Sequence, residues 1–211
     1  MIGIVDYQAG NLTSVARALA YLREECVITG DPRILDAASH IIFPGVGAAG
    51  TAMRNLRERG LDIRLRQWAA EGKPLLGICL GTQVIFAHSD EDDTDCLGIV
   101  PGTVKRFPAD LQADGQRLKI PHMGWNRVAF TAAHPVFAGI PEGAEFYFVH
   151  SYHPVPSDDS WTAGWTEYGI RFAAAVARNS LIAVQFHPEK SGRPGLTLLE
   201  NFCRWRGRYA Q

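Results

Sequence analysis

The sequence predicts an α/β protein with a mixed, largely parallel sheet flanked by helices and an antiparallel extension. In the first half, short apolar and β-branched runs alternate with segments whose apolar residues recur at helical spacing. Continuous apolar runs are typical of parallel strands that are covered on both faces. In the second half, strand-like segments follow one another with only turns between them, which is typical of antiparallel pairing.

The first half contains four expected strands and three expected helices. The strands cover residues 2–6, 26–29, 40–45 and 74–78. Helical spacing predicts helices at 11–24, with Asn11 as N-cap, and at 52–70, and a further helix begins within GTQVIFAHS (81–89). The acidic stretch SDEDDTD (89–95) is expected to be a solvated surface loop.

The second half is expected to consist mainly of strands. They cover residues 98–107, 124–130, 145–152, 161–168, 171–179 and 180–189, and a last helix spans about 195–208. No linker rich in Pro, Gly or Ser interrupts the chain, and no internal repeat occurs. We therefore expect residues 1–211 to form one domain.

Composition excludes several classes of function. The 211 residues carry a net charge of −1, which gives no electrostatic reason to expect nucleic acid or a membrane surface as partner. No apolar run approaches the roughly 20 residues of a membrane span. The four cysteines are widely spaced and form no CxxC pair, so we expect no metal site, no cofactor and a reduced, cytoplasmic protein.

The stretch KPLLGICLGTQVIF (73–86) places one cysteine between Gly77 and Gly81, where a strand is expected to pass into a helix. This Gly-x-Cys-x-Gly pattern has the form of a nucleophile elbow, in which a sharp turn requires small neighbours. The start of a helix favours a negative charge, and the amide of Leu80 can donate to an oxyanion. A buried structural cysteine is the alternative for Cys79.

A thiol nucleophile needs a base and a group that orients the base. QFHPEKS (185–191) offers both, with His187 at the end of an apolar strand and Glu189 two residues later. We expect Pro188 to keep this segment extended, so that the carboxylate reaches back to the imidazole. A second oxyanion donor is expected from the glycine-rich loop FPGVGAAG (43–50), although an ordinary turn after a strand would look similar.

Three separated motifs, PGVG (44–47), GICLGTQ (77–83) and FHPEKS (186–191), resemble in this order those of the class I glutamine amidotransferases. Three more motifs, VDYQAGN (5–11), PHMGWN (121–126) and FVHSY (148–152), are similar to those of the glutaminase subunits of imidazole glycerol phosphate synthases. The resemblance covers nearly the whole chain. It implies the class I amidotransferase fold and the hydrolysis of L-glutamine to glutamate and ammonia.

By this resemblance, Cys79 attacks the side-chain amide, His187 activates the thiol and protonates the leaving ammonia, and Glu189 holds His187. The oxyanion hole would be formed by Leu80 with Val46 or Gly47. Glutamine would be held by Gly47, Gln83, Ser151 and Tyr152.

The resemblance also implies a heterodimer with a cyclase subunit, a (β/α)8 barrel. Ammonia passes to this subunit, which forms imidazole glycerol phosphate and aminoimidazole carboxamide ribotide in histidine biosynthesis. The candidates for the docking face are Tyr7, Asn11, Met123, Trp125, Asn126 and Lys190. Helix capping by Asn11, core packing of Trp125 and plain solvation of Lys190 are the alternatives.

At three positions the sequence departs from the family pattern. Ala49 stands where many relatives carry a bulkier residue, Gln8 where glycine is common, and His153 where tyrosine is frequent. Two other functions remain open on the residues alone. One is a thiol peptidase or glutamyl hydrolase on the same fold, and the other is a non-catalytic binding module.

Overall fold

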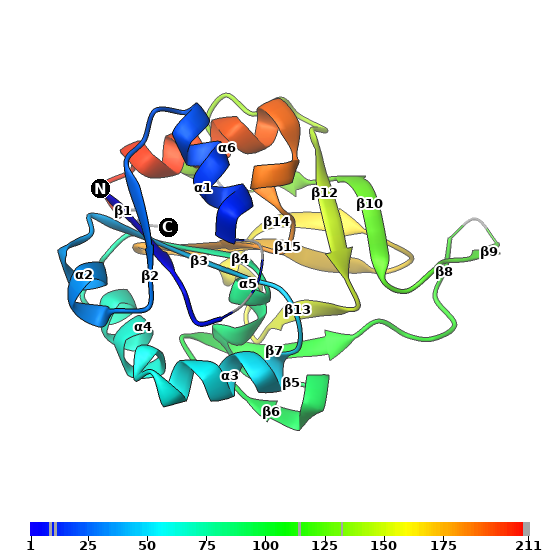
Figure 1. The fold of residues 1–211 in the computed structure, drawn as a ribbon. Coiled ribbons are helices and arrows are strands. Elements are labelled where there is room, and N and C mark those ends of the chain that lie inside the picture. Colours follow the sequence, from blue (N-terminus) through cyan, green and yellow to red (C-terminus); the bar gives the residue numbers. More distant parts are fainter. Residues whose placement is uncertain (9, 11, 114, 132, 209–211) are drawn as a thin grey trace.

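The computed structural model describes residues 1–8, 10, 12–113, 115–131 and 133–208. Within these ranges a central eight-stranded sheet runs in the order β11-β14-β15-β16-β4-β3-β1-β2 (Figure 1). The strands from β16 to β2 are parallel, and β15, β14 and β11 extend the sheet with antiparallel pairing. In chain order they are β1 (Ile2–Val5), β2 (Cys26–Thr29), β3 (His40–Gly45), β4 (Leu75–Cys79), β11 (Ala129–Phe130), β14 (Thr162–Glu167), β15 (Arg171–Arg178) and β16 (Leu181–Val184).

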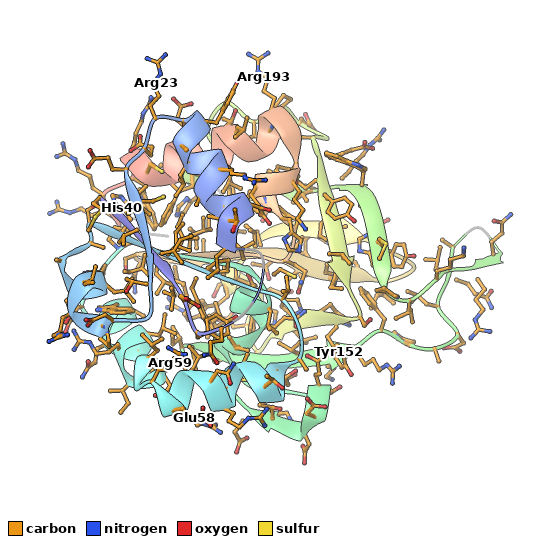
Figure 2. All side chains as sticks on the ribbon, in the orientation of Figure 1. Arg23, His40, Glu58, Arg59, Tyr152 and Arg193 are labelled. Carbon is orange, nitrogen blue, oxygen red and sulfur yellow. The ribbon has the colours of Figure 1, made fainter. Side chains whose placement is uncertain are left out.

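Helices cover both faces of this sheet. They are α1 (Leu12–Tyr21), α2 (Pro32–Ala37), α3 (Ala49–Glu58), α4 (Leu61–Ala70), α5 (Leu80–Val84) and α6 (Gly192–Arg204). Helices α1 and α6 lie on one face, and α2, α3 and α4 lie on the other (Figure 1). Figure 2 shows Arg23 and Arg193 pointing outward beside the α1–α6 layer.

Each face of the sheet has its own apolar core. On the α1–α6 side, Leu19 and Phe202 are buried in one cluster, and on the other side Met53, Leu65 and Trp68 are buried in a second. Every residue of β4, LLGIC, is buried, as expected for a central parallel strand. The predicted fold class is therefore confirmed.

Three smaller β structures lie beside the central sheet. A four-stranded sheet has the order β13-β7-β5-β6, and β10 and β12 form an antiparallel ribbon, as do β8 and β9. Figure 1 shows the β10–β12 ribbon on the side opposite β1 and β2. The bounds are β5 (Phe86–Ser89), β6 (Thr94–Asp95), β7 (Val100–Arg106), β8 (Gln112–Ala113), β9 (Gln116–Arg117), β10 (His122–Arg127), β12 (Glu145–His150) and β13 (Tyr152–Pro156). Short 3₁₀ turns are η1 (Glu91–Asp93), η2 (Pro135–Phe137), η3 (Asp159–Trp161) and η4 (Pro188–Lys190).

Several predicted elements are wrong in extent. The helix predicted over 52–70 is two helices, because Gly60 adopts φ 65° between α3 and α4. The helix expected within 81–89 ends at Val84, and the chain continues as strand β5. Helix α2 was not predicted, although Asp31 accepts from the Arg33 amide at its N-cap and Pro32 follows.

The acidic stretch 89–95 is not a plain loop. It forms η1 and the short strand β6, and it packs along α3. The last helix begins at Gly192 and ends at Arg204, slightly earlier than predicted. Among the described residues, no helix is both long and apolar enough to cross a membrane.

Candidate active site

Cys79 is the last residue of β4 and directly precedes α5. Its backbone has φ 54° and ψ −108°, a conformation that is costly for a residue with a side chain. Strain of this kind amounts to about 1–3 kcal/mol and is kept where the surrounding structure enforces it. The side chain is 7% exposed, so the thiol sits at the edge of the core rather than inside it. This geometry is that of a nucleophile elbow.

The two glycines of the elbow are required by close packing. A Cβ atom at Gly81 would collide with the backbone carbonyl of Phe43 on β3. A Cβ at Gly77 would lie 2.9 Å from the Cβ of Ala183 on β16. Both neighbours belong to strands that flank β4 in the sheet. The elbow is therefore held in place from both sides.

His187 and Glu189 form a buried pair behind the thiol. The Nδ1–H of His187 donates to Oε1 of Glu189 at 2.8 Å, and both side chains are at most 2% exposed. The sequence predicts an extended segment between them. This prediction is wrong, because the segment folds into the 3₁₀ turn η4. This turn brings the carboxylate back to the ring. Ser191 Oγ donates to the His187 carbonyl at 2.6 Å and so holds the turn closed.

The electrostatics of His187 link it to Cys79. Burial disfavours the imidazolium, but the negative charges of the Cys79 thiolate and Glu189 outweigh burial and raise the pKa of His187. Nε2 of His187 is buried and has no hydrogen-bond partner at ordinary distance among the described residues. Since Nδ1 is engaged by Glu189, Nε2 is the nitrogen available to the thiol. The raised pKa favours the imidazolium form of His187.

A cavity of about 350 Å³ opens beside Cys79. Every residue that the sequence proposed for the oxyanion hole or for glutamine binding lines it. The lining residues are Val46, Gly47, Cys79, Leu80, Gln83, Glu91, Pro121, Val149, His150, Ser151 and Tyr152. Tyr152, labelled in Figure 2, lies at the start of β13. A larger cavity of about 640 Å³, around Phe130 and Pro135, contains no cysteine.

The proposed oxyanion donors flank the nucleophile. Leu80 is the first residue of α5, directly after Cys79. Val46 and Gly47 follow the end of β3, where Gly45 pairs with Cys79 across the sheet. Gly47 has φ 103°, a conformation that favours glycine. The loop therefore lies at the cavity, next to the nucleophile.

Two further residues at the site were missed by the sequence reasoning. Gln185 is fully buried, and its Nε2 lies 3.8 Å from the Cys79 Sγ. Glu91 lines the cavity, and its Oε2 accepts from the Ala49 amide at 2.8 Å. Burial raises the pKa of Glu91, although the Ala49 amide acts against this. Glu91 was assigned to a solvated acidic loop, and Gln185 precedes the recognised FHPEKS motif by one residue.

The residues predicted to dock a partner fall into different environments. Met123 and Trp125 are 61% and 56% exposed on one face of β10. Across the ribbon they pair with Val149 and Tyr147, and the Trp125 and Tyr147 rings lie 6.1 Å apart. We call these four residues the ribbon face. Lys190 is exposed, with its Nζ 5.9 Å from the centre of the Tyr147 ring.

The other three residues predicted to dock a partner do not lie on the ribbon face in the described part of the chain. The prediction that Tyr7 belongs to the docking face is contradicted, because its ring is fully buried against Phe43. Asn126 points to the opposite side of β10 from Trp125, as strand alternation requires, and donates to the Glu167 carbonyl at 2.8 Å. Asn11 lies outside the described residues.

The three departures from the family pattern also have defined places. Ala49 begins α3 and is buried. Gln8 adopts φ 66°, where glycine would be unstrained. His153 is buried with its ring 4.9 Å from that of Phe107. None of the three contacts the Cys79 thiol through a hydrogen bond in the described part of the chain.

The described residues contain no group of three or more His, Cys, Asp or Glu side chains that could hold a metal ion. The groups that meet at the site are the Cys79 thiol, the His187 imidazole, carboxylates and backbone amides. A nucleophile, a base and an orienting acid meet at one edge of a sheet beside a cavity. This arrangement suits acyl transfer.

Known proteins resemble this chain over nearly its whole length. The chain matches the family "Glutamine amidotransferase class-I" over residues 3–205. It is 52% identical over 206 residues to an imidazole glycerol phosphate synthase subunit HisH from Nitratidesulfovibrio vulgaris (strain DP4), covering 97% of this chain and 96% of that one. The HisH subunit from Thiobacillus denitrificans is 49% identical, with 97% and 91% covered.

Solved structures resemble the fold more distantly. A crystal structure of a glutamine amidotransferase superposes with a TM-score of 0.72 at 20% identity, covering 96% of this chain and 98% of that one. The structure of PurLQS from Thermotoga maritima gives a TM-score of 0.70 at 17% identity, with 96% and 97% covered. On the family match and the full-length similarity to HisH subunits, this chain belongs to the class I glutamine amidotransferases.

Proposed function

We propose that this chain is the glutaminase subunit of an imidazole glycerol phosphate synthase, with Cys79 as nucleophile, His187 as base and Glu189 as the group that orients His187. One observation carries the proposal: a strained cysteine lines a cavity and is electrostatically coupled to a buried His187–Glu189 pair. The match over residues 3–205 supports a single amidotransferase domain that spans the chain. The free state of Cys26, Cys79, Cys96 and Cys203 supports a reducing, cytoplasmic setting.

In the first half of the reaction the Cys79 thiolate attacks the side-chain amide carbon of glutamine. The carbonyl oxygen becomes an oxyanion, which the Leu80 amide and an amide of the Val46–Gly47 loop would stabilise. The intermediate then expels the amide nitrogen, which takes the proton from His187 and leaves as ammonia. The products of this half are a glutamyl thioester on Cys79 and a neutral His187.

In the second half His187 removes a proton from water, and the resulting hydroxide attacks the thioester carbon. The thiolate leaves, glutamate is released and His187 is again an imidazolium. Glu189 keeps Nδ1 protonated throughout, so that Nε2 always faces the reacting atoms.

The cavity offers groups that suit the two ends of glutamine. Gly47, Gln83, Ser151 and Tyr152 line the same cavity as Cys79, which supports their proposed role in holding glutamine. Glu91 supplies the only carboxylate among the residues that line the cavity in the described part of the chain. We assign it to the α-ammonium group of the substrate, since a half-buried carboxylate gains most from a cation.

The ribbon face is the proposed docking surface for the cyclase subunit, a (β/α)8 barrel. Its Met123 and Trp125 are large, apolar and exposed, which is typical of interface anchors. Val149 belongs both to the ribbon face and to the cavity lining. A partner on this face would therefore cover the cavity, and ammonia could pass to it without entering bulk water.

The proposal is tested by ammonia release from L-glutamine, with and without a co-purified barrel subunit. We expect ammonia release to reach its full rate only with the partner bound. We expect Cys79→Ala to release no ammonia. Equal release by Cys79→Ala would reject the nucleophile. A full rate without partner, or hydrolysis of peptides and γ-glutamyl peptides instead of glutamine, would reject the coupled glutaminase.

A further inference from the structure

Behind the ribbon face, a series of side chains connects Asn126 to the glutamine-binding residues. Asn126 Nδ2 lies 3.3 Å from His122 Nε2, and His122 Nδ1 lies 3.0 Å from His150 Nε2. His150 Nδ1 is 2.7 Å from the Tyr152 carbonyl oxygen. His122 and His150 are 2% and 5% exposed. We call this series, together with Gln83 and Gln185, the inner hydrogen-bond network.

The protons in the inner hydrogen-bond network have one consistent arrangement. The Tyr152 carbonyl can only accept, so His150 carries its proton on Nδ1. Burial lowers the pKa of His150 to about 3 and that of His122 to about 4, so both rings are neutral near pH 7. Nε2 of His150 is then an acceptor, and His122 must donate to it from Nδ1. Nε2 of His122 in turn accepts from Asn126, whose other amide hydrogen goes to the Glu167 carbonyl.

The same Tyr152 carbonyl also fixes the amide of Gln83. Gln83 Nε2 donates to this carbonyl at 3.0 Å and to Oε1 of Gln185 at 3.0 Å. Nε2 of Gln185 then faces the Cys79 Sγ at 3.8 Å. Both amide hydrogens of Gln83 are used, so the group it can offer to a ligand is its carbonyl oxygen. An acceptor oxygen suits an N–H group of bound glutamine, and it disfavours a ligand carboxylate at the same position.

The Tyr152 carbonyl oxygen accepts hydrogen bonds from the side chains of His150 and Gln83. Ser151 separates β12 from β13, and the two strands belong to different sheets. Tyr152 is the first residue of β13 in register with β7, opposite Arg106, and the Ser151 carbonyl before it accepts from the Phe107 amide at 3.0 Å. Of the two side-chain hydrogen bonds to the Tyr152 carbonyl, the one from His150 is the shorter, at 2.7 Å against 3.0 Å from Gln83.

We propose that His122 is a positioning residue for glutamine binding, acting through His150 and the Tyr152 carbonyl on Gln83. This inference rests on the proposed glutaminase function. His122 does not line the cavity, whereas His150 does. His122 therefore acts through its neighbour and not on the substrate.

Two substitutions separate positioning from packing. The His122 ring is stacked between Phe148 and Tyr168, with centroids 4.8 and 4.0 Å away. His122→Phe keeps an aromatic ring there but removes the donor to His150. His122→Asn loses the ring but places an N–H close to where Nδ1 lies. If the His122 ring contributes only packing, His122→Phe should disturb glutamine binding less than His122→Asn. If His122 positions Gln83, His122→Asn should disturb glutamine binding less.

The experiment measures the Kd of L-glutamine by calorimetry in a Cys79→Ala background, with the barrel subunit bound. We expect His122→Phe to raise the Kd by about three- to tenfold, the equivalent of one buried hydrogen bond. His122→Asn should stay within about twofold of the parent although it is the less stable protein. In the active enzyme, His122→Phe should raise KM more than it lowers kcat.

His134→Phe is the matched control. His134 is another buried histidine with a pKa lowered to about 4 by burial, it packs against aromatic rings, and it lies away from the cavity beside Cys79. Its substitution should cost stability without changing the Kd of glutamine. A Kd unchanged by His122→Phe, or raised equally by His122→Asn, would overturn the inference. If the parent Cys79→Ala complex binds no glutamine, the proposed function itself fails.

A spectroscopic measurement on the unaltered protein makes the test independent of folding defects. Nitrogen NMR of ¹⁵N-histidine-labelled protein should show His122 and His150 neutral at pH 7 with the proton on Nδ1. The commoner Nε2–H tautomer on His150, or a charged ring, would contradict the proton arrangement and with it the proposed role.

Discussion

The elbow at Cys79 and the ribbon face border the same cavity but are built in opposite ways. The elbow is wedged between β3 and β16 so tightly that no Cβ fits at Gly81. On the ribbon face, by contrast, Met123 and Trp125 are more than half exposed. Reacting atoms need fixed geometry, which neighbouring strands supply, whereas a docking surface needs apolar area that is still in water. The difference indicates which substitutions should damage catalysis or folding and which only association.

Among these substitutions, Glu189→Gln should have the largest effect, because it acts on the tightly held site around the elbow. It removes the charge that helps to raise the pKa of His187, and turnover should fall by about 10²-fold or more. Because the pKa of His187 drops, the imidazolium is lost at lower pH. The alkaline limb of kcat/KM should therefore move to lower pH. Pairing of His187 stabilises the fold below its unfolded pKa, and this contribution should also disappear earlier as pH rises.

The control for this change is Glu200→Gln, which removes a surface carboxylate paired with Arg204 on α6. Its pH profile should match that of the parent protein. An unshifted alkaline limb in Glu189→Gln would contradict the orienting role of Glu189.

Gly81→Ala tests the packing of the elbow. The new methyl group meets the Phe43 carbonyl, and the free energy of unfolding should fall by about 3 kcal/mol or more. Denaturant unfolding measures this. Gly72→Ala is the control, since Gly72 has φ 79° but open space around it, and left-handed strain alone costs about 1–2 kcal/mol. Equal losses in the two variants would mean that the elbow is not tightly held.

Trp125→Ala tests the ribbon face as a docking surface. We expect the Kd of the complex with the barrel subunit to rise by about 30-fold or more. The isolated chain should keep its stability to within about 1 kcal/mol, because the ring is 56% exposed. Trp161→Ala, at a half-buried tryptophan under Arg178, should leave the Kd unchanged. A large loss of stability in Trp125→Ala would assign the ring to the core.

Gln8→Gly is expected to have the smallest effect. Gln8 and Cys79 both have positive φ, but only Cys79 is held in a turn that the proposed reaction uses. Relief of strain at Gln8 is partly cancelled by the greater freedom of glycine in the unfolded chain, so stability should rise by about 0.5–1 kcal/mol. A decrease in urea unfolding experiments would show that the side chain of Gln8 makes a stabilising contact.

The parts of the site with local signatures could be predicted from the sequence. Strands at 26–29 and 40–45 appear as predicted, because continuous apolar runs leave little choice. The elbow at Cys79 and the contact between His187 and Glu189 follow from residues close together in the chain. Their short separation in the sequence indicates which groups can meet, although the turn η4 that brings Glu189 to His187 was not predicted.

Features set by distant packing could not be predicted. The run VIFAHS fits a helix or a strand, and pairing with β6 and β7 makes its last four residues strand β5. Glu91 looks solvated in an acidic stretch, yet α3 covers it and the Ala49 amide binds it. Tyr7 was assigned to the docking face by the family resemblance, whereas the structure buries its ring against Phe43. The contact between His122 and His150 joins residues 28 positions apart, for which the sequence offers no signal.

The most direct test of the account is the covalent intermediate. The complex is mixed with glutamine, quenched in acid and digested, and the peptides are mapped by mass spectrometry. We predict a glutamyl thioester on Cys79, which accumulates when hydrolysis is slowed and is absent in Cys79→Ala. Ammonia release at the full rate by Cys79→Ala, or a glutamyl adduct on Cys26, Cys96 or Cys203 in place of Cys79, would contradict the central claim.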